Sequence, residues 1–301
     1  MELRSDIAID IKNLTKSYPG REALNEVTFS VKKGSVHGFL GPNGAGKSTT
    51  MKIISGLIPA TSGEFLVNGK IGFLPEHPPL YPNMTVRDYL QFVLDIYSLT
   101  ASKNLVDNVM SKTGLTHVAN RLIGNLSKGY QQRVGIAQAL VYSPEIIILD
   151  EPTVGLDPVA LAEIRDLISS LKKDHTILFS THQLHDVELL CSDITLINHG
   201  KIVVSGPLIS ILENLKTRMT IEARVENFSE ELKNQMMKRF ALESIEYSKS
   251  DGNYFKIKLT GMGQDNMKKE CARFLADETI GLLEFGELKL DLEELFKQMV
   301  H

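Results

Sequence analysis

A glycine-rich segment that ends in a lysine and two hydroxyl side chains is the part of the sequence best suited to chemistry. It consists of Gly41, Pro42, Asn43, Gly44, Ala45, Gly46, Lys47, Ser48 and Thr49. Glycines can adopt positive φ, so successive backbone N–H groups can point into one concavity and hold an anion. Lys47 would then reach the β- and γ-phosphates of a nucleotide, and the Ser48 hydroxyl would bind Mg²⁺. The segment predicts a phosphate-binding loop.

The sequence on both sides of this loop supports the prediction. An apolar run predicts a strand over Val36–Leu40, and a helix is predicted over residues 50–55. In this order the loop lies at a helix N-terminus, where unpaired N–H groups and the helix dipole favour an anion. The alternative interpretation, a glycine turn beside an unrelated lysine, is disfavoured by this strand, turn and helix context.

Two acidic residues, Asp150 and Glu151, follow a continuous apolar run at residues 146–149. The run predicts a central parallel strand that is buried on both faces. Asp150 at its end can hold Mg²⁺ opposite the phosphate loop. Glu151 can accept a proton from, or orient, the water that attacks the γ-phosphate. The alternative is a helix cap followed by a surface acid.

His182 and Ser127 are two further candidates. His182 follows a predicted strand at residues 176–179, and the carboxyl ends of parallel strands meet at the edge of the sheet where ligands bind. His182 could therefore reach the γ-phosphate, although a lone histidine is usually structural. Ser127 precedes an apolar helix, so it could cap that helix and present N–H groups to an anion. This second helix N-terminus could contact phosphate if it closed over ATP that is bound by another subunit.

Composition limits the classes of protein that fit the chain. Its 301 residues are 43% hydrophobic, enough for one large domain or two smaller ones. The net charge of −4 gives no general attraction to nucleic acid. Cys191 and Cys271 lie in separate apolar runs, which favours buried thiols and fits a cytosolic compartment. No stretch approaches the roughly 20 apolar residues of a membrane span, so another chain would have to cross any membrane at which this protein works.

The elements around these residues alternate between strands and helices. Alternating apolar residues predict strands at 7–11 and 27–31 on either side of a turn at 16–20. Short strands at 64–67 and 71–74 follow the phosphate loop. Thr85 is predicted to cap a helix that runs through residue 98, and Ser102 a helix that runs through residue 113. A further helix starts near Pro158, and a hairpin joins residues 194–197 and 202–204.

A change of pattern near residues 212–218 predicts a domain boundary at 215. Residues 216–301 predict strands at 219–225, 244–248, 254–259 and 280–288, with helices at 229–239, at 264–276 and from 291. A turn at 251–252 would join the second and third of these strands. The order βαββαβ predicts a small α+β domain of ferredoxin-like type without a catalytic constellation.

The chain resembles the ATP-binding subunit of an ABC transporter over about residues 5–215. Residues 41–49 match the Walker A motif, and residues 146–151 match Walker B with its catalytic glutamate. The ABC signature, the D-loop and the switch histidine are matched at Ser127–Lys128–Gly129, at Gly155–Leu156–Asp157 and at His182. From the residue alone Tyr18 could be an exposed stacking platform or an ordinary turn aromatic, and the second is favoured; the resemblance implies instead that it stacks on adenine.

Two motifs depart from the family pattern. The signature contains Lys128 and Tyr130 in place of a glycine and a glutamine, and Glu76 occupies the position of the Q-loop glutamine. Glu76 could still ligate Mg²⁺, but it adds negative charge beside the phosphates. These departures, the run at 80–86 and the ending at 292–296 most resemble the ABC-2-type multidrug and gliding-motility exporter branch.

The resemblance implies an α/β fold: a P-loop NTPase core over residues 1–215 with an N-terminal antiparallel β subdomain and a helical subdomain at about 85–142. It also implies a homodimer. Each ATP, with Mg²⁺, would be bound by Tyr18, Lys47 and Ser48 of one subunit and by Ser127 and Gly129 of the other. Asp157 would transmit the state of the site across the interface between the subunits. Lys47, Glu151 and His182 would carry out hydrolysis.

The partner implied by the resemblance is a separate transmembrane permease, which places the chain on the cytoplasmic face of the inner membrane, with motion passing through the loop at 76–89. A soluble ABC ATPase that acts on nucleic acid or ribosomes is the main alternative. Such proteins usually carry two cassettes or a long coiled-coil insertion, and the sequence has no basic strip with interleaved aromatics. An importer subunit is a further alternative.

Overall fold

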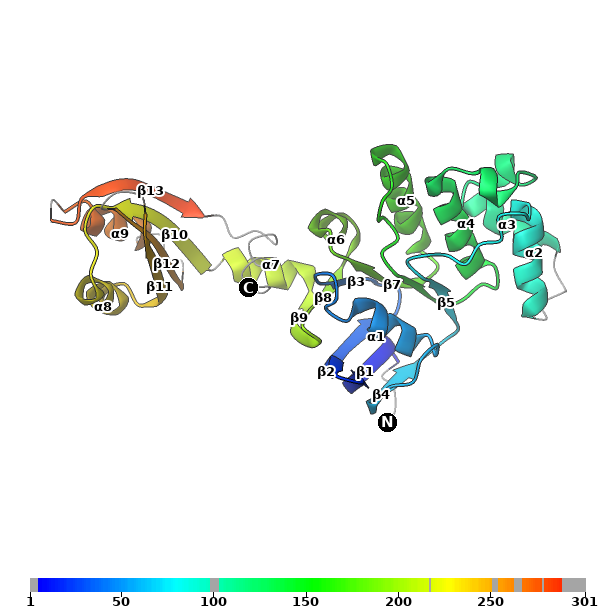
Figure 1. Ribbon diagram of the computed structural model, residues 1–301, viewed down its shortest axis with the longest axis horizontal. Helices are drawn as coiled ribbons and strands as arrows, with labels where there is room; N and C mark the ends of the chain where they lie inside the picture. Colours follow the sequence, from blue (N-terminus) through cyan, green and yellow to red (C-terminus); the bar gives the residue numbers. More distant parts are fainter. Residues whose placement is uncertain are drawn as a thin grey trace. The chain divides into compact units, whose positions relative to one another are not determined.

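The computed structural model describes residues 5–97, 103–216, 218–250, 254–262, 267–277 and 279–288. The chain divides into two compact units, Met1–Leu208 and Ile209–His301. Figure 1 labels most of the helices and strands of both units. The sequence pattern predicts the boundary at residue 215, whereas the division falls at the start of a helix, α7 (Leu208–Lys216).

A six-stranded sheet forms the centre of the first unit. Its order is β5 (Ile71–Leu74), β6 (Ile146–Leu149), β7 (Thr176–Thr181), β3 (Val36–Leu40), β8 (Asp193–Asn198) and β9 (Lys201–Pro207). All neighbouring pairs are parallel except β8 and β9, which form the predicted antiparallel hairpin. Every residue of β6 is buried between two parallel neighbours, which confirms the prediction for this strand.

A second, antiparallel sheet has the order β2 (Arg21–Lys32), β1 (Ile7–Tyr18) and β4 (Ser62–Val67). Alternation along β1 puts Ile9 and Ile11 on its inner face, where they are fully buried. They share one core with Phe39 of the large sheet and with Met51 and Ile53 of α1 (Lys47–Ile54). This core fixes the position of the helix that follows the phosphate loop.

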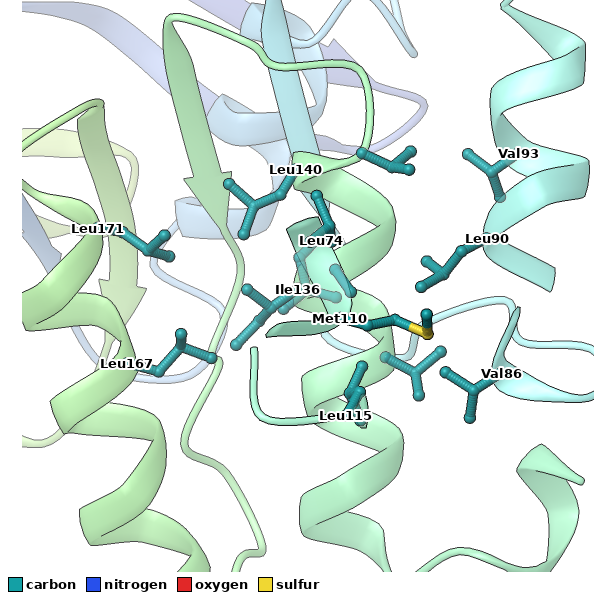
Figure 2. Close-up of a cluster of buried hydrophobic side chains, with 14 of the residues drawn as sticks. Leu74, Val86, Leu90, Val93, Met110, Leu115, Ile136, Leu140, Leu167 and Leu171 are labelled. Carbon is teal, nitrogen blue, oxygen red and sulfur yellow. The ribbon is translucent and has the colours of Figure 1, made fainter. Parts of the chain in front are cut away.

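Three helices, α2 (Val86–Ile96), α3 (Lys103–Lys112) and α4 (Lys128–Leu140), share a second core with α5 (Pro158–Leu171). The helix α2 begins at Thr85 as predicted, because the Thr85 hydroxyl accepts a hydrogen bond from the Asp88 N–H. The predicted cap at Ser102 lies outside the described residues. Figure 2 shows the side chains that fill this core, among them Val86, Leu90, Val93, Met110, Leu115, Ile136, Leu140, Leu167 and Leu171.

The second unit contains one antiparallel sheet of order β11 (Leu242–Lys249), β12 (Phe255–Met262), β10 (Arg218–Val225) and β13 (Leu282–Leu288). The helices α8 (Glu230–Arg239) and α9 (Met267–Leu275) contribute Met236 and Cys271 to its core. The predicted order βαββαβ is therefore observed. The turn at 251–252 and the helix from residue 291 lie outside the described residues.

Among the described residues, two α-helices were not predicted from the sequence. The first, α6 (Leu184–Leu190), has seven residues and no side-chain cap, so its sequence signal is weak. The second is α7, in which Leu208, Ile211 and Leu212 follow helical spacing. No helix in the described part of the chain is long and apolar enough to cross a membrane.

Candidate nucleotide-binding site

The glycine-rich segment forms the loop between β3 and α1, as predicted. Gly44 and Gly46 have φ of 80° and 114°, a region that side chains disfavour. A Cβ on Gly46 would also lie 2.6 Å from Leu24 Cδ2, so this turn requires glycine. The helix α1 begins at Lys47, three residues earlier than predicted, which places Lys47 and Ser48 in its first turn.

Lys47 is buried against the loop that precedes it. Its Nζ donates hydrogen bonds to the carbonyl oxygens of Gly41, at 2.7 Å, and Pro42, at 3.3 Å. The same atom lies 3.0 Å from Glu151 Oε1, and both side chains are only 6% exposed. The structure therefore holds one buried cation beside one buried anion, at the position where phosphate oxygens would compete for the cation.

Asp150 lies directly after β6 and faces two serines. Ser48 Oγ donates to Asp150 Oδ1 at 3.1 Å, and Ser180 Oγ donates to the same oxygen at 2.6 Å. Burial raises the pKa of Asp150, and the charges of Glu151 and Glu76 act in the same direction, while the two serine hydrogen bonds oppose them. A cation at this carboxylate would relieve the cost of its buried charge.

The Ser48 and Asp150 oxygens fit a magnesium ion. Neighbouring ligands of octahedral Mg²⁺, each about 2.1 Å from the metal, are about 3 Å apart, and these two oxygens are 3.1 Å apart. Among the described residues, no three or more His, Cys, Asp or Glu side chains come together in a group that could hold a metal ion. The pair therefore fits an ion that takes its remaining ligands from phosphate and water.

Glu151 and His182 meet at the carboxyl ends of the neighbouring strands β6 and β7. His182 Nδ1 lies 2.9 Å from Glu151 Oε2, and the Glu151 N–H donates to Ser180 Oγ at 2.8 Å. Glu151 has φ of 50°, a strained conformation for a residue other than glycine, which persists only where its surroundings hold it. The His182 side chain is 41% exposed, so it is accessible from the cavity beside it.

One cavity of about 460 Å³ joins most of the predicted residues. It is lined by Tyr18, Arg21, Ala23, Asn43, Gly44, Gly46, Lys47, Ser48, Thr49, Glu76, Glu151, Val154 and His182. Tyr18 is at the end of β1 and is 45% exposed. Arg21 was not predicted from the sequence. It donates to the Gly44 carbonyl at 3.0 Å, and its place at the start of β2, just after the turn that follows Tyr18, was the available signal.

The signature and D-loop residues do not line this cavity. Ser127 occupies the N-cap position of α4, but its hydroxyl makes no capping hydrogen bond and its side chain is exposed, so the expected side-chain cap is absent. Gly129 is buried, and a Cβ there would lie 2.7 Å from Ala160 Cβ of α5. Asp157 caps α5 by accepting hydrogen bonds from the N–H groups of Val159 and Ala160 at 3.0 Å.

A glycine loop between a buried parallel strand and a helix, with an acidic pair after another parallel strand of the same sheet, defines a P-loop nucleoside triphosphatase. A family model described as ABC transporter matches residues 24–154. Over 302 residues the chain is 32% identical to the uncharacterized ABC transporter ATP-binding protein YxlF of Bacillus subtilis (strain 168), which covers 97% of this chain and 99% of that protein.

Two further comparisons agree. The chain is 42% identical over 206 residues to the lantibiotic transport ATP-binding protein SrtF of Streptococcus pyogenes, covering 65% of this chain and 89% of SrtF. The dimeric structure of MJ0796, a bacterial ABC transporter cassette, matches with a TM-score of 0.61 and 28% identity, over 66% of this chain and 98% of that one.

The chain belongs to the family of ABC transporter ATP-binding proteins. It is the ATP-binding subunit of such a transporter, and it hydrolyses ATP. Subunits of this family work with membrane subunits and dimerise.

Proposed function

We propose that this chain drives an ABC-2-type exporter as a homodimer whose two subunits close head to tail over ATP. The observation that carries the proposal is the incomplete site of the single chain. Tyr18, Lys47 and Glu151 line the cavity, whereas Ser127 and Gly129 do not. A second copy could supply the signature residues. The similarity to SrtF, a protein named for lantibiotic transport, supports export.

In the proposed mechanism Tyr18 stacks on the adenine, and the loop N–H groups cradle the phosphates. Glu151 is the base that takes a proton from the attacking water, and His182 positions the γ-phosphate. The ion pair of 3.0 Å between Lys47 and Glu151 supports a link between binding and catalysis. When the phosphates attract Lys47, Glu151 loses its cationic partner and becomes available as the base.

Mg²⁺ would be held by Ser48 and Asp150, whose oxygens have the required spacing. It would neutralise charge that develops on the phosphates. Glu76 lines the same cavity and is the proposed third metal ligand. Its carboxylate is also one of the charges that raise the pKa of Asp150, so a cation between the two would stabilise both.

An apolar groove beside α2 is the proposed docking site for the membrane subunit. It has a volume of about 480 Å³, and its wall includes Tyr81, Phe92 and Tyr97. These three aromatic side chains are 51%, 37% and 51% exposed. A cluster of exposed apolar side chains is typical of a surface that binds another protein. The segment at 76–89, which the structure shows as a loop that leads into the first turn of α2, would transmit motion, because it contributes Glu76 to the nucleotide cavity and Tyr81 to this groove.

The second unit is proposed to be a ferredoxin-like accessory domain, a class supported by its βαββαβ order and its antiparallel sheet of order β11, β12, β10 and β13. The cassette would comprise residues 1–215 and this domain residues 216–301, a boundary that assigns most of α7, at the start of the second unit, to the cassette. Its proposed role is to stabilise the dimer or to dock a subunit, with ligand sensing as the alternative.

The experiment that tests the proposal is purification of the tagged full chain from gently solubilised membranes of its natural host. We expect a polytopic membrane protein to co-purify, in keeping with a position on the cytoplasmic face of the inner membrane. Tyr81→Ser and Phe92→Ser should weaken that association, while Leu189→Ser, an exposed apolar residue outside the groove, should not. Retention of nucleic acid that is lost with added salt would instead favour the soluble ATPase.

A further inference from the structure

Asp186 is a buried carboxylate outside the nucleotide cavity. It lies in α6, four residues after His182, and its exposed fraction is 0%. Its Oδ2 accepts a hydrogen bond from Thr153 Oγ1 at 2.7 Å. Its Oδ1 accepts one from Arg165 Nε at 2.6 Å and forms an ion pair with a second nitrogen of the same guanidinium. Both oxygens of the carboxylate are therefore used.

The partners of Asp186 lie on two other segments, each of which also carries a site residue. Thr153 is two residues after Glu151 and is 1% exposed. Arg165 is in α5, the helix that Asp157 caps. A single carboxylate thus joins the loop after Glu151, the helix after the D-loop and the helix after His182.

We infer that Asp186 is a positioning residue for ATP hydrolysis, which holds Glu151 and His182 in register through Thr153; this inference depends on the proposed role of Glu151 as the base. The strained φ of 50° at Glu151 has to be imposed by neighbouring contacts. One is the hydrogen bond from its own N–H to Ser180, and the anchored Thr153 fixes the chain just beyond it.

The position of the anchor separates catalysis from nucleotide binding. Within the described part of the chain, the hydrogen bonds and ion pairs of Asp186 reach only Thr153 and Arg165. The phosphate loop is held by hydrogen bonds of Lys47 to the Gly41 and Pro42 carbonyls and of Ser48 to Asp150, and Tyr18 pairs with Arg21 at the end of β1. Loosening the anchor should therefore displace the catalytic carboxylate while the phosphate loop and Tyr18, which bind the nucleotide, stay in place. A misplacement of about 1 Å at a reacting group can lower a rate by about 100-fold.

Thr153 permits the sharpest test, because its hydroxyl can be removed with little change of shape. Thr153→Val removes the hydroxyl that donates to Asp186, whereas Thr153→Ser keeps it. Asp186→Asn keeps an oxygen that can accept from Thr153 but removes the charge that faces Arg165. The control is Asp193→Asn, which removes another carboxylate of low exposure, at 7%, from its 2.7 Å ion pair with Lys32 at the amino end of β8.

The experiment measures kcat, KM and the affinity for a fluorescent ATP analogue in the full chain, with thermal unfolding as a check of folding. We expect Thr153→Val and Asp186→Asn to lower kcat by about 10- to 100-fold and to change KM and analogue affinity less than about twofold. Thr153→Ser and Asp193→Asn should retain wild-type kcat.

Wild-type kcat in folded Thr153→Val, or an equal loss of kcat in Thr153→Val and Thr153→Ser, would overturn the inference. A parallel loss of ATP affinity would also overturn it, because the anchor would then serve the whole fold. Glu151→Gln is measured beside these variants. If it turns over ATP at the wild-type rate, the proposed role of Glu151 fails, whatever the Thr153 variants do.

Discussion

The buried pair of Lys47 and Glu151 gives a quantitative prediction for the nucleotide-free protein. Both side chains are 6% exposed, and Lys47→Ala would leave the Glu151 carboxylate without its cation. Removing one partner of a buried ion pair costs about 3 to 5 kcal/mol. His182 remains 2.9 Å from the carboxylate and the site opens to a cavity, so we expect the lower limit, about 3 kcal/mol.

Thermal unfolding of the nucleotide-free full chain measures this cost. For a unit of the size of Met1–Leu208, each kcal/mol shifts Tm by roughly 2 to 4 °C, so Lys47→Ala should lower Tm by roughly 6 to 12 °C. The double variant Lys47→Ala, Glu151→Gln leaves no buried charge without a partner, so it should recover about 2 kcal/mol of the free energy of unfolding. Lys112→Ala is the matched control: its 2.9 Å ion pair with Asp174 is more than half exposed on both sides and should be worth less than about 1 kcal/mol.

The reasoning fails if Lys47→Ala costs no more than Lys112→Ala. It also fails if the double-mutant cycle gives a coupling energy within about 0.5 kcal/mol of zero, the scatter expected for independent sites.

Three other predictions concern ATP hydrolysis, ATP binding and the buried charge of Asp150. Glu151→Gln should retain ATP binding and lower the hydrolysis rate by about 100- to 10,000-fold; phosphate release at the wild-type rate would refute the assigned base. Tyr18→Ala should raise the Kd for ATP by about 5- to 150-fold if the ring stacks on adenine, and Tyr18→Phe should restore it; equal binding by Tyr18→Ala would contradict the stacking. Burial raises the pKa of Asp150, so between 3.8 and the raised pKa the folded protein binds a proton that the unfolded chain has lost, and stability falls as pH rises through that window. Asp150→Asn removes this penalty, so thermal unfolding of the nucleotide-free variant at pH 7 should give a higher Tm than wild type, while hydrolysis is lost; a lower Tm at pH 7 would show that the carboxylate charge stabilises the fold.

The parts of the fold that depend on local pattern could be predicted from the sequence. A continuous apolar run identified β6. The two acidic residues that follow β6 and His182, which follows β7, lie together at the carboxyl ends of these strands, as expected for parallel neighbours. Thr85 and Ser229 cap their helices through hydrogen bonds that span three residues, so their signals are local.

Features that arise from tertiary contacts could not be predicted. The ion pair of Lys47 with Glu151 joins residues about a hundred positions apart, and no periodicity encodes it. The Asp186 anchor likewise depends on the packing of α5 and α6. Ser127 has the residue type and position of a helix cap, yet its hydroxyl makes no capping hydrogen bond, which residue type alone cannot reveal.

The most direct test of the central claim, that one ATP is held by the phosphate loop of one subunit and the signature of another, is the mass of Glu151→Gln in solution. Light scattering coupled to gel filtration should give the mass of one chain without nucleotide and of two chains with ATP and Mg²⁺. Adding Ser127→Arg should keep the protein monomeric with ATP still bound. A monomer of Glu151→Gln that is saturated with ATP, or a dimer that Ser127→Arg leaves intact, would contradict the account.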